Sequence, residues 1–231
     1  MKRAFIRGLW GIYDNSCWMT RMRAKMDREI LPVVQNEFTE KFVTYVMGEE
    51  NYNLIRKLIP DAIMIAKEPF VFDIMKFQHR NKMEIIKYAI DQDGYDEVVW
   101  LDWDCVPTKK LPSDFWDYLS KKEVFQANLQ RYKRNMTPWR KIDNGCVPNG
   151  GYMYLRDKQL IHKAIKVWDA MPQTNDEIAW AKVTDEMMGG WEGIDKYWRI
   201  FESDCSNLRR MTPFSATMIA QKKNVCFLHR L

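Results

Sequence analysis

The sequence predicts an α/β protein with a single domain, in which helices flank a mostly parallel central sheet. Short apolar runs alternate with amphipathic stretches through the first half of the chain, as they do in α/β proteins. The run Glu97–Leu101 (EVVWL) is typical of a strand buried on both faces of a parallel sheet. With 46% hydrophobic residues, a chain of 231 residues can bury a full core without disulfides or a structural metal.

Alternating strands and helices are predicted in order along this first half. Residues 4–12 are mostly apolar and contain two glycines, and 41–47 (KFVTYVM) is rich in β-branched and aromatic residues. Residues 49–59 begin with two glutamates, which favour a helix start, and 79–91 place three apolar residues on one helical face. The full expectation is strand 4–12, helix 18–34, strand 41–47, helix 49–59, strand 62–65, helix 79–91 and strand 97–101.

The second half is less regular. Its expected elements are helix 115–121, strand 124–129, strand 152–155, helix 158–171, helix 176–183 and strand 225–228. Neither an internal repeat nor a linker-like stretch divides the sequence. We therefore expect one domain over residues 1–231, with a regular half up to about residue 107 and a looser half from about residue 108.

Composition excludes several classes of protein. Charged residues make up 29%, with nine Pro and ten Gly, which excludes disordered and collagen-like chains. The net charge of +5 tolerates an anionic ligand but is far from a polybasic composition.

Cellular location is predicted from the cysteines and from the apolar runs. Five well-separated cysteines without a C-x-x-C motif favour reduced thiols. No apolar run approaches the roughly 18 residues of a membrane span, and Arg7 interrupts any signal-peptide core. A cytoplasmic protein is expected, unless a membrane anchor lies outside this sequence.

Two aspartates, Asp102 and Asp104, follow the buried strand directly in DEVVWLDWDCVP. The bare D-x-D pattern is weak, and Asp91–Asp93 repeats it where a helix ends and the residues are solvated. Open α/β sheets, however, bind ligands at the carboxyl ends of their strands. Side chains two apart on an extended chain face the same side, so both carboxylates can meet one hard cation that bridges to a diphosphate. The competing interpretation is a pair of solvated aspartates.

This stretch resembles the strand and D-x-D motif of glycosyltransferases with the GT-A fold, which use nucleotide-diphospho-sugars. The segment NGGYMY, which begins at Asn149 and Gly150, resembles the family's small-residue turn beside the sugar pocket. Asp185 and Glu186 lie where these enzymes keep an acceptor-side carboxylate. His229 is similar to the C-terminal metal-binding histidine of glycogenin-like and lipopolysaccharide galactosyltransferase-like members, although the usual tail after it is absent.

The resemblance implies a hexosyl- or pentosyltransferase that depends on Mn²⁺ or Mg²⁺ and takes a nucleotide-diphospho-sugar, with a UDP-sugar as the expected donor. The implied metal ligands are Asp102, Asp104 and His229, and Asp185 or Glu186 would face the reaction centre. Residues 1–107 would bind the nucleotide-sugar, and residues 108–231 would bind the acceptor.

Further donor contacts are implied on the first loop and on the helix before the D-x-D strand. Gly8 would allow close approach of the backbone, and Trp10 or Tyr13 would stack on the base. Arg80 and Lys82 match the family's basic residues near the donor phosphates. Asp102, Asn149 and Gly150 complete the implied donor site. Core packing for Trp10 and a solvated helix start for the two cations are the alternatives.

The acceptor is left open by the stretch 130–141, which holds five cations and two aromatics in twelve residues. Such residues suit sugar rings, and they equally suit a phosphate backbone with stacked bases. The expected acceptor is a glycan or small molecule, and the alternative is a modified base in DNA. A rival from another class is a non-catalytic nucleic-acid-binding module on the same fold. A nucleotidyltransferase is disfavoured because the sequence lacks an early Gly-rich phosphate loop with a lysine.

Overall fold

The computed structural model describes residues 1–11, 40–57, 59–70, 79–103, 105–107, 110–122, 125–131, 146–171, 176, 179–180, 182–183, 205–208 and 227–230. The elements are, in order, β1 (Arg3–Leu9), β2 (Phe42–Met47), α3 (Glu49–Ile55), β3 (Ile63–Ile65), α4 (His79–Asp91), β4 (Glu97–Leu101), β5 (Cys105–Pro107), α5 (Phe115–Lys122), β6 (Phe125–Arg131), β7 (Cys146–Leu155), α6 (Lys158–Asp169), β8 (Cys205–Leu208) and β9 (Phe227–Arg230).

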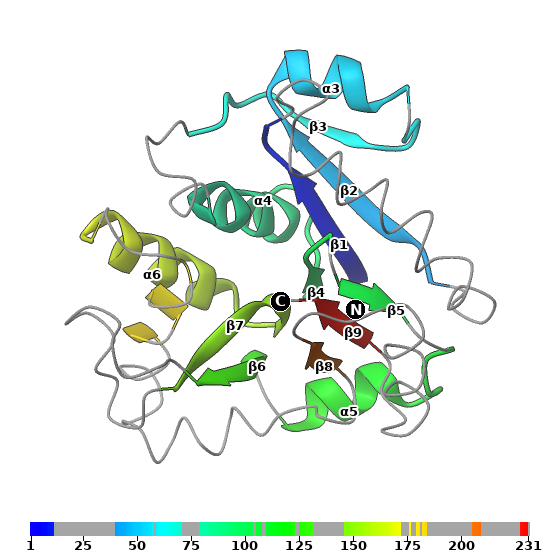
Figure 1. The fold of residues 1–231 in the computed structure, drawn as a ribbon, viewed down its shortest axis with the longest axis vertical. Helices are drawn as coiled ribbons and strands as arrows, with labels where there is room; N and C mark the ends of the chain where they lie inside the picture. Colours follow the sequence, from blue (N-terminus) through cyan, green and yellow to red (C-terminus); the bar gives the residue numbers. More distant parts are fainter. Residues whose placement is uncertain are drawn as a thin grey trace.

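The central sheet has six strands in the order β3-β2-β1-β4-β7-β6 (Figure 1). The four strands from β3 to β4 are parallel to one another, and β7 runs antiparallel to both β4 and β6. A second sheet has the order β5-β9-β8. Because β5 follows β4 after a short turn, the second sheet begins at the carboxyl edge of the central one.

Strand alternation builds two apolar layers on the central sheet. On β4, Val98 and Trp100 pack with residues of α4 and α6 in one buried cluster. Val99 and Leu101 point to the opposite face and pack with α5 and with Phe227 of β9. The β4 strand is therefore buried on both faces, as its apolar run predicts. Within the part of the chain described, each helix is too short or too polar to cross a bilayer.

Several element bounds differ from the sequence prediction. The strand expected over 4–12 ends at Leu9, the helix expected over 49–59 ends at Ile55, and the strand expected at 152–155 is the end of a ten-residue β7. The sequence did not predict β5 and β8, because CVP and CSNL lack the apolar, β-branched run that marks a short strand such as β3 (IMI). The helix expected over 18–34 lies outside the described residues.

Candidate functional site

Asp102 lies at the carboxyl edge of the sheet, directly after β4. Its backbone nitrogen donates to the carbonyl of Gly151 on β7 at 2.9 Å, which fixes the start of the turn. Its side chain lies on the same face of the sheet as those of Val98 and Trp100, and it reaches Lys82 of α4. Asp102 is 27% exposed, so its carboxylate is partly accessible at the edge where open α/β sheets bind ligands.

Lys82 of α4 is the buried cation of this edge, with a side chain that is only 2% exposed. Its Nζ lies 3.1 Å from Asp102 Oδ1 and 3.3 Å from Asp102 Oδ2, and it donates to the carbonyl of Gly150 at 3.0 Å. Trp100 Nε1 donates to Asp102 Oδ1 at 2.6 Å. Lys82 and Trp100 thus hold the Asp102 carboxylate from two sides.

Asp176 is a second carboxylate in contact with the same lysine. Its Oδ2 lies 3.4 Å from Lys82 Nζ, and its Oδ1 lies 3.0 Å from His79 Nδ1. Within the described part of the chain, neither oxygen meets a donor in hydrogen-bond geometry, so these contacts are charge pairs. We name His79, Lys82, Asp102, Gly150 and Asp176 the Lys82 cluster.

Burial and charge oppose each other in this cluster. Burial acts to raise the pKa of the Asp176 carboxyl, but the Lys82 and His79 cations outweigh it and hold that pKa well below its usual range. Burial acts to lower the pKa of His79, yet the Asp176 carboxylate raises it above its ordinary value. With His79 protonated, two cations balance two carboxylates, which makes the burial of these charges tolerable.

Gly150 occupies a position where a side chain has no room. A Cβ built there would lie 2.6 Å from Asp176 Oδ2 and 2.9 Å from Lys82 Nζ. The glycine is therefore needed for the charge cluster itself. The turn expected at the NGG segment is wrong, because the structure places these residues inside the strand β7. Asn149 is in β7, and its side chain is outside the described residues.

A metal site depends on residues that the structure describes only in part. β9 pairs antiparallel with β5, with His229 opposite Cys105. This register brings the backbone of His229 next to the residue that follows Asp104. Asp104 and the His229 side chain lie outside the described part, in which no three potential ligands gather around one point. Carboxylate oxygens suit Mn²⁺ or Mg²⁺, so the two aspartates of the expected donor set fit the expected ion.

The other predicted donor residues have different surroundings. Gly8 packs tightly: a Cβ there would lie 2.4 Å from Ile85 Cδ1, so core packing accounts for the glycine. Trp10 is half-buried against the α4 side of the core. Arg80 is buried and pairs with Glu84 at 2.6 Å and with Asp169 at 2.9 Å, which ties α4 to α6.

Tyr13, Asp185, Glu186 and residues 132–145 lie outside the described residues. Their predicted roles stay predictions.

Sequence reasoning missed Asp176 and His79. Asp176 stands at the start of the helix expected over 176–183, where residues 176, 179–180 and 182–183 are indeed helical. An acidic residue at a helix start is ordinarily read as a favourable charge near the positive end of the helix dipole. No local signal indicates that it meets a lysine on another helix.

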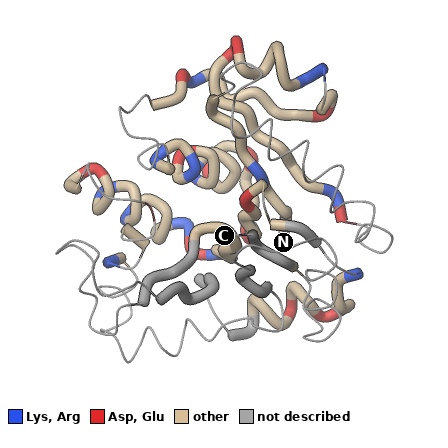
Figure 2. Tube along the Cα trace, viewed as in Figure 1, with Lys and Arg blue, Asp and Glu red and all other residues tan. Residues whose placement is uncertain are grey.

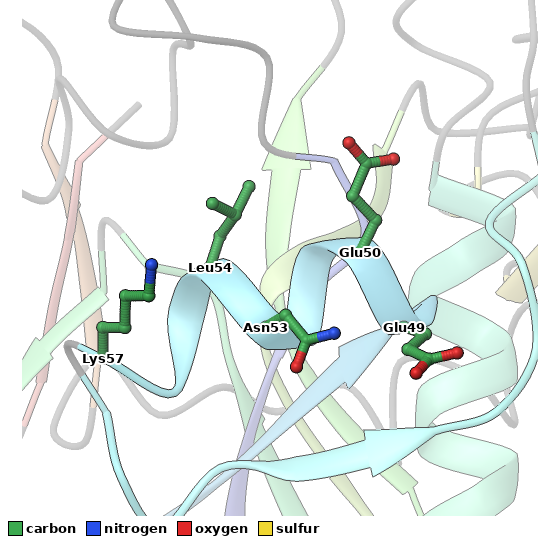
Figure 3. A pocket seen from close by; sticks show the side chains of 5 residues that line it. All are labelled: Glu49, Glu50, Asn53, Leu54 and Lys57. Atoms are coloured by element: carbon green, nitrogen blue, oxygen red, sulfur yellow. The ribbon is translucent and has the colours of Figure 1, made fainter.

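A hollow on the outer face of α3 is a weaker candidate for a binding site. Its lining side chains spread outward from α3 and the turn that follows it, and they do not converge (Figure 3). They are Glu49, Glu50, Asn53, Leu54 and Lys57. Over the described trace, acidic and basic residues are interspersed and form no large patch of one sign (Figure 2). The Lys82 cluster is therefore the better candidate site.

No protein-family model matches the chain, and no curated protein matches it in sequence. Solved structures match its fold. A glycosyltransferase involved in the glycosylation of the major capsid of PBCV-1 is 9% identical, with a TM-score of 0.51, over 99% of this chain and 93% of that one. The galactosyltransferase LgtC, in complex with donor and acceptor sugar analogs, is 13% identical, with a TM-score of 0.54, over 100% and 87%. Mouse xyloside xylosyltransferase 1 is 12% identical, with a TM-score of 0.53, over 98% and 97%. At these identities the likeness establishes the fold, and the chain has the GT-A-like α/β fold of solved glycosyltransferases.

Proposed function

We propose that the protein is a metal-dependent glycosyltransferase that moves a sugar from a nucleotide-diphospho-sugar to an acceptor hydroxyl. The observation that carries the proposal is the position of Asp102: a partly exposed carboxylate at the carboxyl end of β4, held by Lys82 and Trp100. In this fold, that edge is where a ligand is expected. A solvated pair of aspartates would not need a buried lysine and an indole directed at one of them.

Asp102, Asp104 and His229 would hold Mn²⁺ or Mg²⁺. When bound there, the ion would neutralise the charge that develops on the departing diphosphate. The register that sets His229 opposite Cys105 supports this ligand set, because it brings the end of the chain to the D-x-D turn.

The chain's own residues prepare this edge. Lys82 supplies a positive charge next to Asp102, where we expect the diphosphate, and Asp176 balances that charge when no donor is present. Asp176 is only 1% exposed and is paired on both sides, so we assign it a positioning role. Asp185 or Glu186 remains our proposed carboxylate at the reaction centre.

The proposed acceptor is a glycan or small molecule with a free hydroxyl. The LgtC structure binds an acceptor sugar analog, and it shares this fold over the full length of the present chain. The basic and aromatic stretch 130–141 can stack on sugar rings as it can on bases.

The test is release of nucleoside diphosphate from a panel of nucleotide-sugars in the presence of Mn²⁺, with UDP-sugars first. Asp104→Asn should abolish release with the fold retained, and EDTA should do so reversibly. Asp91→Asn is the matched control, because Asp91 belongs to the other D-x-D pattern and pairs with Lys87 and His162 at the surface. Full turnover by a metal-free preparation in EDTA would contradict the proposal.

A further inference from the structure

Trp103 stands between the two aspartates of the D-x-D motif and projects away from the Lys82 cluster. Its side chain is buried, at 6% exposure, and packs with Leu9, Val46 and Ala62. Its Nε1 donates to the carbonyl of Gly8 at 2.8 Å. The residue between the carboxylates is thus anchored to the end of β1, on the face opposite to Asp102.

Arg7 of β1 strengthens the same connection. Its guanidinium lies 5.4 Å from the centroid of the Trp103 ring and 3.7 Å from that of Phe42. Its Nη2 donates to the carbonyl of Cys105 at 3.3 Å. Gly8 therefore accepts a hydrogen bond from the Trp103 indole before position 104, and the Arg7 guanidinium donates one to Cys105 after it. Two consecutive residues of β1 thus hold the chain on both sides of this position.

The turn has two further fixed points in its backbone. Asp102 N donates to Gly151 O, and Cys105 N donates to Asp102 O, each at 2.9 Å. Together with the β1 contacts, these bonds fix Asp102, Trp103 and Cys105, the described residues on both sides of position 104. A metal site requires its ligands within a few tenths of an ångström of their coordination distances, so the precision of this turn sets the affinity for the ion.

We propose that Trp103 is a positioning residue for the metal site, acting through its N–H bond to Gly8; this inference rests on the proposed function. Packing alone does not require tryptophan, because a phenylalanine ring would fill much of the same volume. The indole N–H supplies what phenylalanine lacks: a donor that satisfies a buried strand carbonyl and fixes the rotation of the D-x-D turn.

The test compares Trp103→Phe with Trp168→Phe. Trp168 is also a buried indole, but it lies on α6 in the core cluster and not at the turn. Arg7→Met is a second variant, in case Trp103→Phe folds poorly. We would measure Mn²⁺ dissociation constants by calorimetry without donor, thermal midpoints, and amide hydrogen exchange of peptides covering residues 1–11 and 98–107.

Trp103→Phe should weaken Mn²⁺ binding about tenfold, the size of effect seen when hydrogen bonds that orient metal ligands are lost. Trp168→Phe should lower the thermal midpoint by a similar amount but leave the Mn²⁺ affinity unchanged. Exchange should rise at both the β1 and the D-x-D peptides in Trp103→Phe and Arg7→Met. Unchanged Mn²⁺ affinity in Trp103→Phe, or an equal loss in Trp168→Phe, would overturn the inference. If wild type binds neither Mn²⁺ nor Mg²⁺ while the exchange effect is present, the proposed function fails and the structural link between β1 and the turn remains.

Discussion

Lys82 Nζ lies 3.4 Å from Asp176 Oδ2, and both side chains are almost completely buried. The pair joins α4 to the helical residues around position 179, at the point where the lysine also contacts Asp102. Removing one member of a buried ion pair is costly because the other charge stays without compensation. Here one lysine serves two carboxylates, so its loss leaves both without that charge.

Lys82→Met should therefore lower the free energy of unfolding by about 3–5 kcal/mol. Lys87→Met is the control on the same helix, because Lys87 is 35% exposed and pairs with Asp91 at the surface. Its cost should stay below about 1 kcal/mol. Urea denaturation of both variants measures the difference, and equal costs would show that the buried pair has no special weight.

Gly150→Ala should disturb the cluster from its other side. A methyl group there lies 2.6 Å from Asp176 Oδ2 and 2.9 Å from Lys82 Nζ, so the ion pair must shift. We expect a loss of about 1–3 kcal/mol in unfolding free energy, and nucleotide-sugar turnover should fall as well.

The comparison variant is Gly94→Ala. Gly94 has no atom within 4 Å of a built Cβ, but its φ is +68°. This variant should cost about 1 kcal/mol through backbone strain and leave turnover intact. Normal turnover in Gly150→Ala would separate Gly150 from the active site.

The elements that the sequence predicted best are those with strong local patterns. The expected bounds of α4 and β4 agree with the structure, because one has helical apolar spacing and the other is a short apolar run. Asp102 could be predicted at the ligand edge for the same reason, since its place follows from the end of β4.

The contacts that define the site come from distant segments. Asp176 meets Lys82 only through the packing of two helices, and His229 meets the D-x-D turn only through the pairing of β5 with β9. Arg80, the other cation predicted near the donor phosphates, pairs with Glu84 and Asp169, and its predicted role toward the donor stays a prediction. Residue type and position alone could not predict that Lys82 contacts Asp102 while Arg80 links α4 to α6.

The His79–Asp176 pair predicts a pH dependence of stability. The pKa of His79 is raised by the Asp176 carboxylate, so its contribution is full below the ordinary imidazole value of about 6.5 and is lost as the pH rises through the raised value. The pKa of Asp176 is lowered, so its contribution is lost only as the pH falls through that lowered value. The pair should stabilise most between about pH 4 and pH 6.5.

His79→Gln should accordingly destabilise the protein more at about pH 6 than at about pH 9. His162→Gln is the control, because His162 pairs with Asp91 at the surface and is 43% exposed. Unfolding free energies of both variants and wild type across this range give the result. A constant difference between wild type and His79→Gln would mean that the histidine is not charged in the folded state.

The last prediction concerns His229, which the register sets opposite Cys105 beside the D-x-D turn. If its imidazole is a metal ligand, His229→Ala should raise the Mn²⁺ dissociation constant by about tenfold or more, with a much smaller change in thermal midpoint. Added Mn²⁺ should then partly restore turnover, because a site with fewer ligands still fills at higher concentration.

His162→Ala is the matched control, since it removes an imidazole from the surface of α6. It should change neither the Mn²⁺ affinity nor the Mn²⁺ concentration needed for half-maximal turnover. A structural role for His229 would give the opposite pattern: a lower thermal midpoint, with unchanged Mn²⁺ dependence in the protein that remains folded. That result would leave Asp102 and Asp104 as the proposed ligands, and the remaining coordination positions would then fall to the donor diphosphate and water.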